Sequence, residues 1–261
     1  MLRALILGDI VGAPGCRAVF SGLGGLISRT RADIVIANGE NAAEGRGIRP
    51  QDVSALFGAG VQIITSGNHI WQKREILPLL ESEDRLLRPE NYPAGVAGKG
   101  HCVLSVKGVP VAVLNLQGRE QLPSIRCPFR VGRESVARLA QQGAVILVDF
   151  HAEAPDEKES LAYHLDGRCA LVFGTHTHVQ TADERILSGD TGFITDIGMT
   201  GPAESIIGMS IETGIRRGQT QMPLRMEVED RLAPVCGILV ELDTDRRVAT
   251  SITRIREASL V

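Results

Sequence analysis

The 261-residue sequence has few aromatic residues, no excess of basic residues and no long hydrophobic run. Aromatic side chains make up 3%, with Trp71 as the single tryptophan, and the formal net charge is −3. A surface that follows a long nucleic acid is normally basic and often carries aromatic rings for stacking, so no long nucleic acid is expected as a partner. No apolar run approaches the ~20 residues that cross a bilayer, so no membrane partner is expected either.

Cysteine is scarce and scattered along the chain, at Cys16, Cys102, Cys127, Cys169 and Cys236. The odd number and the lack of a C-x-x-C pair argue against a disulfide framework and against a thiolate metal site. The apolar start of the chain is interrupted by Asp9 before a signal-peptide core can form. These features predict a cytoplasmic protein.

The dominant pattern is a short apolar strand followed at once by a polar turn that contains glycine. Predicted strands of this kind cover residues 2–7, 32–37, 61–65, 144–148 and 169–173. Helix-like stretches lie between them, at residues 16–28, 50–58, 72–80, 131–142 and 156–165. Strands that are apolar on both faces and alternate with helices indicate a buried, mainly parallel sheet.

Two further segments have the pattern of antiparallel hairpins. Residues 101–118 would turn at Lys107-Gly108, and residues 235–256 would turn near Thr244-Asp245. We expect these hairpins to add a second sheet packed on the first, within one α/β domain that covers residues 1–261. Residues 199–234, rich in Gly, Met and Pro, are predicted to be a long functional or interface loop. The Met-rich and apolar stretches in 199–224 are consistent with a homo-oligomer.

The segment FGTHTHVQT, residues 173–181, places two of the six histidines one residue apart after an apolar run. In an extended strand alternate side chains share a face, so His176 and His178 would point the same way. Two such imidazoles could form a polar strand end, each bonded to a nearby carbonyl. They could also bind one cation or two adjacent cations.

Other polar side chains follow the predicted strands at the edge where an α/β sheet binds its ligands. They are Asp9, Glu40, Asn41, Asn68, His69, His151, His176 and His178. This mixed nitrogen and oxygen set contains no thiol and suits Mn²⁺, Fe or Zn²⁺. The set is larger than one tetrahedral ion needs, but it suits two metals about 3.5–4 Å apart that share a bridging carboxylate.

The order of these motifs resembles the calcineurin-like metallophosphoesterases, whose usual signature is D-x-H, G-D-x-x-D/N, G-N-H-D/E, H and G-H-x-H. The sequence has Asp9, N-G-E-N at 38–41, S-G-N-H at 66–69, His151 and G-T-H-T-H at 174–178. It is more similar still to the YmdB-type bacterial phosphodiesterase branch, whose L-G-D-I-x-G pattern is present at 7–12. The resemblance implies a sandwich of two packed mixed β-sheets flanked by helices.

Two positions depart from the wider superfamily. Val11 stands where the D-x-H motif has its histidine, and Glu40 replaces the usual bridging aspartate. Both changes are normal in the YmdB-type branch, and the resemblance implies that Asn41 fills the vacant ligand position. It implies two divalent or trivalent ions per chain, Fe or Mn in the first place and Zn as an alternative. The implied ligands are Asp9, Asn41 and His178 for one metal, and Asn68, His151 and His176 for the other, with Glu40 as the bridge.

The resemblance further implies hydrolysis of a small phosphodiester, a 2′,3′-cyclic nucleotide, by a metal-bridging hydroxide. Two divalent ions outweigh the charges of Asp9, Glu40 and a hydroxide, so the centre would attract a phosphoryl group. His69 follows a ligand and would be placed to protonate the leaving oxygen as general acid. In the loop after Glu40, the side chains of Glu44, Arg46 and Arg49 could line the site, where an arginine could hold a phosphate oxygen.

Two other functions are consistent with the same residues. One is a metal-dependent amide or lactone hydrolase, although amidohydrolase barrels carry H-x-H on their first strand. The other is a non-catalytic regulator that senses a metal or a nucleotide. His69 is not needed as a ligand, so its presence favours catalysis.

Overall fold

A computed structural model describes residues 1–225 and 227–258 and contains two mixed β-sheets. The first sheet has the strand order β13-β12-β1-β3-β4. Its parallel part consists of β1 (Leu2–Leu7), β3 (Ile34–Asn38) and β4 (Ile63–Thr65). The antiparallel strands β12 (Val235–Asp243) and β13 (Val248–Glu257) complete this sheet beside β1.

The second sheet has the order β5-β6-β7-β8-β10-β9. Its parallel strands are β6 (Val109–Gln117), β7 (Val145–His151), β8 (Leu171–Thr175) and β10 (Gly192–Ile194). The edges are the antiparallel strands β5 (His101–Val106) and β9 (Arg185–Ile186). A small parallel pair joins β2 (Asp9–Ile10) to β11 (Met199–Thr200).

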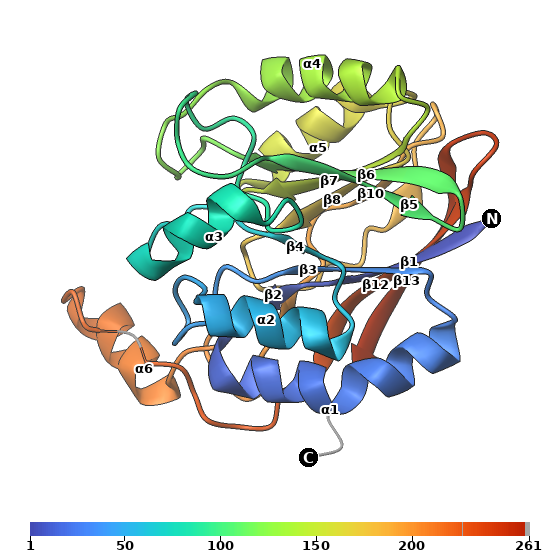
Figure 1. The fold of residues 1–261 in the computed structure, drawn as a ribbon. Helices are drawn as coiled ribbons and strands as arrows, with labels where there is room; N and C mark the ends of the chain where they lie inside the picture. Colours follow the sequence, from blue (N-terminus) through green and yellow to red (C-terminus); the bar gives the residue numbers. More distant parts are fainter. Residues whose placement is uncertain (226, 259–261) are drawn as a thin grey trace.

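Helices cover the outer face of each sheet (Figure 1). On the first sheet lie α1 (Gly12–Thr30) and α2 (Pro50–Ala59); on the second lie α4 (Pro128–Ala140) and α5 (Pro155–Leu165). The short helices η1 (Arg74–Ile76) and α3 (Leu77–Ser82) follow β4, and α6 (Ile211–Thr220) protrudes beside α1 and α2. The expected α/β/β/α sandwich of two packed mixed sheets is confirmed.

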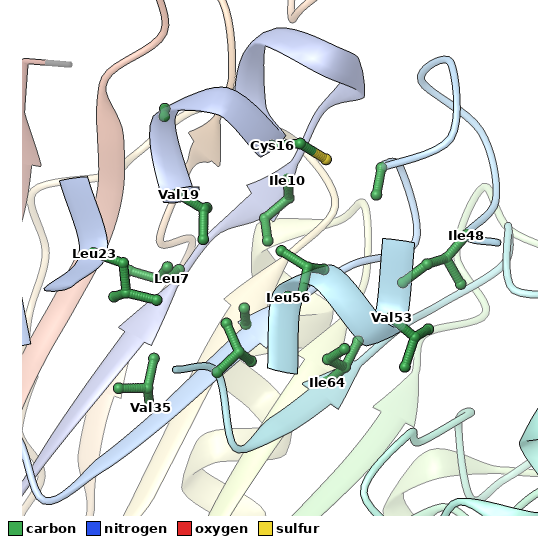
Figure 2. Packing of buried hydrophobic residues seen from close by; sticks show 14 of the residues in the cluster. Leu7, Ile10, Cys16, Val19, Leu23, Val35, Ile48, Val53, Leu56 and Ile64 are labelled. Carbon is green, nitrogen blue, oxygen red and sulfur yellow. The ribbon is translucent and has the colours of Figure 1, made fainter. Parts of the chain in front are cut away.

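Burial of apolar side chains between these layers holds the sandwich together. One cluster lies between α1, α2 and the first sheet, where Leu23 and Leu56 pack near Leu7 and Val35 (Figure 2). A second fills the space between the sheets, and a third lies under α4 and α5. Because both faces of each sheet are covered, the parallel strands are apolar on both sides, which is the pattern that the sequence shows.

The membership of the two sheets differs from the expectation. The two predicted hairpins form, but they do not make a second sheet of their own. Instead β12 and β13 extend the first sheet beside β1, while β5 and β6 extend the second sheet beside β7. The strands predicted for one parallel sheet are thus divided between the two sheets, because pairing partners are chosen by long-range packing that a local apolar pattern does not encode.

One helix and one loop differ from the prediction. The helix-like stretch at 72–80 is divided into η1, from Arg74, and α3, from Leu77, which places Pro78 in the first turn of α3, where its missing N–H is tolerated. The predicted loop at 199–234 contains α6, which begins after Ser210, whose hydroxyl accepts a hydrogen bond from the Thr213 N–H. Two glycines within α6 weaken its helical signal in the sequence. Among the described residues, no helix is long and apolar enough to cross a membrane.

Candidate metal centre

The eight candidate side chains come from the carboxyl ends of strands in both sheets. Glu40 and Asn41 follow β3, and Asn68 and His69 follow β4, in the first sheet. His151 ends β7, while His176 and His178 follow β8, in the second sheet. Asp9 lies in β2, directly after β1. The centre is therefore built where the ends of the two packed sheets meet, rather than at the edge of one sheet.

Three of these side chains converge around His151. Its Nε2 atom lies 2.9 Å from Glu40 Oε1, 3.1 Å from Asn68 Oδ1 and 3.0 Å from His176 Nδ1. Glu40, His151 and His176 can each offer a ligand atom such that all three atoms lie within 4.8 Å of one another. Glu40 and His151 are fully buried. The structure thus brings together Asn68, His151 and His176, the three ligands predicted for one metal, and Glu40, the predicted bridge.

A second group lies beside the first. Asn41 Nδ2 is 3.1 Å from His178 Nε2 and 3.4 Å from Asp9 Oδ1, and His178 Nε2 is 3.8 Å from Asp9 Oδ1. The His176 N–H donates to Asp9 Oδ2 at 3.2 Å, which ties the two groups together. For Asn41 to offer its oxygen here, its amide would turn over, because Oδ1 now faces His69 Nδ1 at 2.9 Å.

Each of the three imidazoles has its other ring nitrogen facing a polar partner away from the centre. His151 Nδ1 donates to the Thr175 hydroxyl at 2.9 Å, and His178 Nδ1 donates to the Ile207 carbonyl at 2.8 Å. His176 Nε2 lies 3.1 Å from a carboxylate oxygen of Glu153. Such partners fix the tautomer of a metal-binding histidine and direct its remaining nitrogen at the ion. The three remaining nitrogens all face the centre.

The charges at the centre suit a cation. Burial alone would raise the pKa of Glu40, but His151 and His69 outweigh it and lower the pKa to about 2. Burial alone would lower the pKa of His151, but Glu40 and Asp9 outweigh it and raise the pKa to about 9. Among the described residues, Glu40 Oε1 is buried without a hydrogen-bond partner, although it lies 2.9 Å from His151 Nε2, and a metal ion would supply the partner that this oxygen lacks. The residues present fit a metal centre.

The spacing argument for His176 and His178 was wrong. Strand β8 ends at Thr175, and both histidines have positive φ, 102° and 66°. They do not share a strand face; a turn with left-handed backbone directs one ring to each group. Positive φ is uncommon for residues other than glycine and is kept only where surroundings enforce it.

A buried ion pair supplies part of that enforcement. Lys158 Nζ, from α5, lies 2.7 Å from Asp196 Oδ2, and both side chains are almost fully buried. The Asp196 carboxylate also accepts hydrogen bonds from the Thr177 N–H at 3.2 Å and the Gly198 N–H at 2.8 Å. Asp196 thus fixes the turn between the two histidines. No pattern in the sequence pointed to Lys158, because it lies in an ordinary helical segment.

The turn that carries Asn68 and His69 depends on Gly67. A Cβ atom at Gly67 would lie 2.0 Å from the His151 ring, so only glycine allows this approach. The His69 N–H donates to Glu40 Oε2 at 2.9 Å, and its side chain is 22% exposed. Burial lowers the pKa of His69; Glu40 opposes this, whereas His151 and Arg46 add to it. His69 therefore lies at the rim of the centre, close to Arg46.

Asp149 and Thr175 belong to the centre but were missed. The Thr175 hydroxyl accepts from His151 and donates to Asp149 Oδ1 at 2.7 Å, so the three form a chain of hydrogen bonds. Both residues are fully buried, and burial raises the pKa of Asp149 to about 7. Their polarity within apolar strands, at D-F-H and G-T-H-T-H, was the available signal.

Replacing Thr175 with valine is expected to weaken metal binding about 10–100-fold, because His151 loses the acceptor that fixes its Nδ1 proton. The affinity can be measured by competition with a chromogenic chelator. Thr191→Val is the matched control: its hydroxyl is also buried, but it donates to the Cys169 carbonyl at 2.7 Å, outside the centre. Equal affinities for the two variants would contradict the assigned role of Thr175.

The fold and the centre together define a metallophosphoesterase-like protein. A solved structure described as a novel phosphatase from Mycoplasma pneumoniae has a TM-score of 0.92 and 33% identity, covering 98% of this chain and 93% of that chain. A hypothetical protein from Thermus thermophilus has a TM-score of 0.91 and 38% identity, covering 99% of this chain and 100% of that one.

Sequence comparison places the chain more narrowly. The 2′,3′-cyclic-nucleotide 2′-phosphodiesterase of Bacillus subtilis (strain 168) is 42% identical over 254 residues, which is 97% of this chain and 96% of that protein. The family model described as YmdB-like protein matches residues 5–255. The chain belongs to the YmdB-like family, so the resemblance seen in the motifs is confirmed.

Proposed function

We propose that this protein is a phosphodiesterase that holds two metal ions per chain and hydrolyses 2′,3′-cyclic nucleotides. The name of the Bacillus subtilis relative, a 2′,3′-cyclic-nucleotide 2′-phosphodiesterase, supports the reaction class and the substrate. The observation that supports the two-metal centre is the convergence of two adjacent donor groups, in which each imidazole has its outer nitrogen next to a polar partner.

Each of the two groups of contacting side chains would hold one ion. Asp9, Asn41 and His178 would hold one ion, and Asn68, His151 and His176 the other. Glu40 would lie between them, since it contacts His151 and its neighbour in the chain is Asn41. Nitrogen and oxygen ligands of this kind suit Fe or Mn, with Zn as an alternative. When bound, such a pair activates water as a nucleophile and stabilises charge on phosphoryl oxygens.

His69 would act on the leaving oxygen. Its main chain is anchored on Glu40 and its ring contacts Asn41, so the imidazole is held at the rim without being one of the seven donors. Burial lowers the pKa of His69 and favours the neutral ring. The negative charge of a bound phosphodiester would act in the opposite direction and favour the protonated imidazole. A proton delivered from His69 would then neutralise the alkoxide that departs.

The proposal is tested by metal analysis and a substrate series on one preparation. Protein reconstituted with Mn²⁺ or Fe²⁺ should contain about two ions per chain and should hydrolyse 2′,3′-cyclic AMP in a chelator-sensitive way. Amides and lactones, which the alternative enzyme would use, serve as the comparison set. A single ion per chain would refute the dinuclear centre. Metal-dependent cleavage of amides or lactones alone would replace the phosphodiesterase by the hydrolase.

A further inference from the structure

A cavity of about 810 Å³ runs along the first half of α1 and the loop that follows Asn41. One wall is the face of α1 that carries Ala13, Cys16, Arg17 and Phe20, and the facing wall includes the loop after Asn41. The start of α1 is joined to this loop, because the Gly12 N–H donates to the main-chain carbonyl of Asn41, a candidate ligand, at 2.9 Å. The volume lies within the range of small-molecule sites, about 300–1,000 Å³.

The basic side chains of this cavity differ in their partners. Arg17 pairs with Asp230, while Arg49 and Lys73 both pair with Glu44. Arg46 also lines the cavity, and within the described part of the chain it has neither an ion pair nor a side-chain hydrogen bond. It is exposed, and its charge is close enough to affect His69. Its guanidinium is thus available to an anion that binds between the cavity and His69.

The loop that carries Arg46 is held in place by its own backbone. Gly45 N donates to the Asn41 carbonyl at 3.1 Å, Arg46 N donates to Ala43 O at 3.0 Å, and Ala43 N donates to Gly47 O at 2.9 Å. Gly47 has φ of 85°, and a Cβ there would lie 2.8 Å from the Lys73 side chain. A loop fixed in this way presents Arg46 at a defined position beside Asn41 and His69.

The far end of the cavity carries an exposed aromatic ring. Phe20 lines the cavity and is 49% exposed. It follows Gly12 by eight positions, so it lies about 12 Å along the helix from the Gly12–Asn41 hydrogen bond, at about 1.5 Å per residue. A nucleoside attached to a phosphate reaches about as far from its phosphorus atom.

We propose that this cavity binds the nucleoside of the diester substrate, with Phe20 stacked on the base and Arg46 bonded to a phosphate oxygen. An arginine fork bonds two oxygens of a phosphate at once, and base stacking on an aromatic ring tolerates any base. The inference rests on the proposed function, since the phosphate is assigned to the metal centre. The inference assigns the nucleoside, which the metals would not contact, to this cavity.

The role of Phe20 is tested by comparing 2′,3′-cyclic AMP with glycerol 1,2-cyclic phosphate, a cyclic diester that has no base. Phe20→Ala should raise KM for the cyclic nucleotide about tenfold, within the range expected for loss of one stacked base. KM for the glycerol ester and kcat for both should change less than about twofold, because no base is stacked there. Tyr163→Ala, which removes a 56% exposed ring on α5, is the matched control. Equal effects of Phe20→Ala on both substrates would overturn the stacking.

Arg46 should act on both substrates, since both carry the phosphate. Arg46→Ala is expected to raise KM for each about tenfold, the effect of losing one charge-assisted hydrogen bond. Arg133→Ala, on α4, removes another exposed arginine without an ion pair among the described residues and should leave both KM values unchanged. An unchanged KM in Arg46→Ala would remove this residue from the site.

A binding measurement keeps the inference separate from the proposed function. Saturation-transfer NMR on the chelator-treated full chain with adenosine 3′-monophosphate should show transfer to the base protons, and Phe20→Ala should abolish most of it. If neither cyclic diester is hydrolysed but the base protons receive saturation through Phe20, the proposed function fails and the nucleoside cavity stands. If the diesters are hydrolysed but the base receives none, the cavity assignment fails.

Discussion

Glu40→Gln is expected to leave the protein with fewer than two metal ions per chain and to reduce diester hydrolysis about 1,000-fold. A loss of this size corresponds to about 4 kcal/mol of transition-state stabilisation that the metals would otherwise supply. Glu40 is fully buried, and neighbouring imidazoles hold its pKa at about 2 against the effect of burial, so it is a carboxylate at every pH of interest. Glutamine keeps the shape but supplies no charge. The loss should therefore fall on the ions and not on packing.

Metal content by atomic emission and hydrolysis of 2′,3′-cyclic AMP measure this effect. Glu157→Gln is the matched control, because Glu157 is also a buried carboxylate but accepts hydrogen bonds from the Arg119 and Glu120 N–H groups instead. It should lose stability and keep its metals. A Glu40→Gln protein that retains two ions and full activity would remove Glu40 from the bridging position.

The sequence predicted that the candidate side chains lie close together, because their positions after apolar strands are local information. Each of the clusters at Glu40, Asn68, His151 and His176 follows an apolar strand, and carboxyl ends of parallel strands bind ligands in this class of fold. The sequence did not predict which sheet each strand joins. β3 and β7 have the same apolar pattern, yet they lie in different sheets, because that choice depends on packing between distant segments.

The backbone of the histidine turn was beyond sequence analysis for a different reason. T-H-T-H has a strand-like alternation, but Asp196 and Lys158 hold the turn in a conformation that the four residues would not adopt alone. The Ile207 carbonyl that orients His178 could not be predicted either, because every residue has a backbone carbonyl and its role does not depend on residue type. What tertiary contacts impose on a turn cannot be read from the turn itself.

His69→Ala is expected to keep its metals and to lose about 10²–10⁴-fold of its rate on 2′,3′-cyclic AMP, the usual contribution of general acid catalysis. The loss on an activated aryl diester should be much smaller. A ribose alkoxide is a poor leaving group and gains from a proton as the P–O bond breaks, whereas a nitrophenolate departs without one. His69 is held beside the donors by its own main chain and by Asn41, so its ring can be removed without removing a ligand.

The ratio of the two rate losses and the metal content decide between this role and a structural one. If His69 were a ligand or a support for Asn41, its removal would release metal or destabilise the fold, and both substrates would suffer alike. His164→Ala is the matched control, because His164 lies in α5 with its ring against Phe129, away from the centre. It should leave both rates and the metal content unchanged. Equal losses on the two substrates, with both metals retained, would falsify the general-acid role.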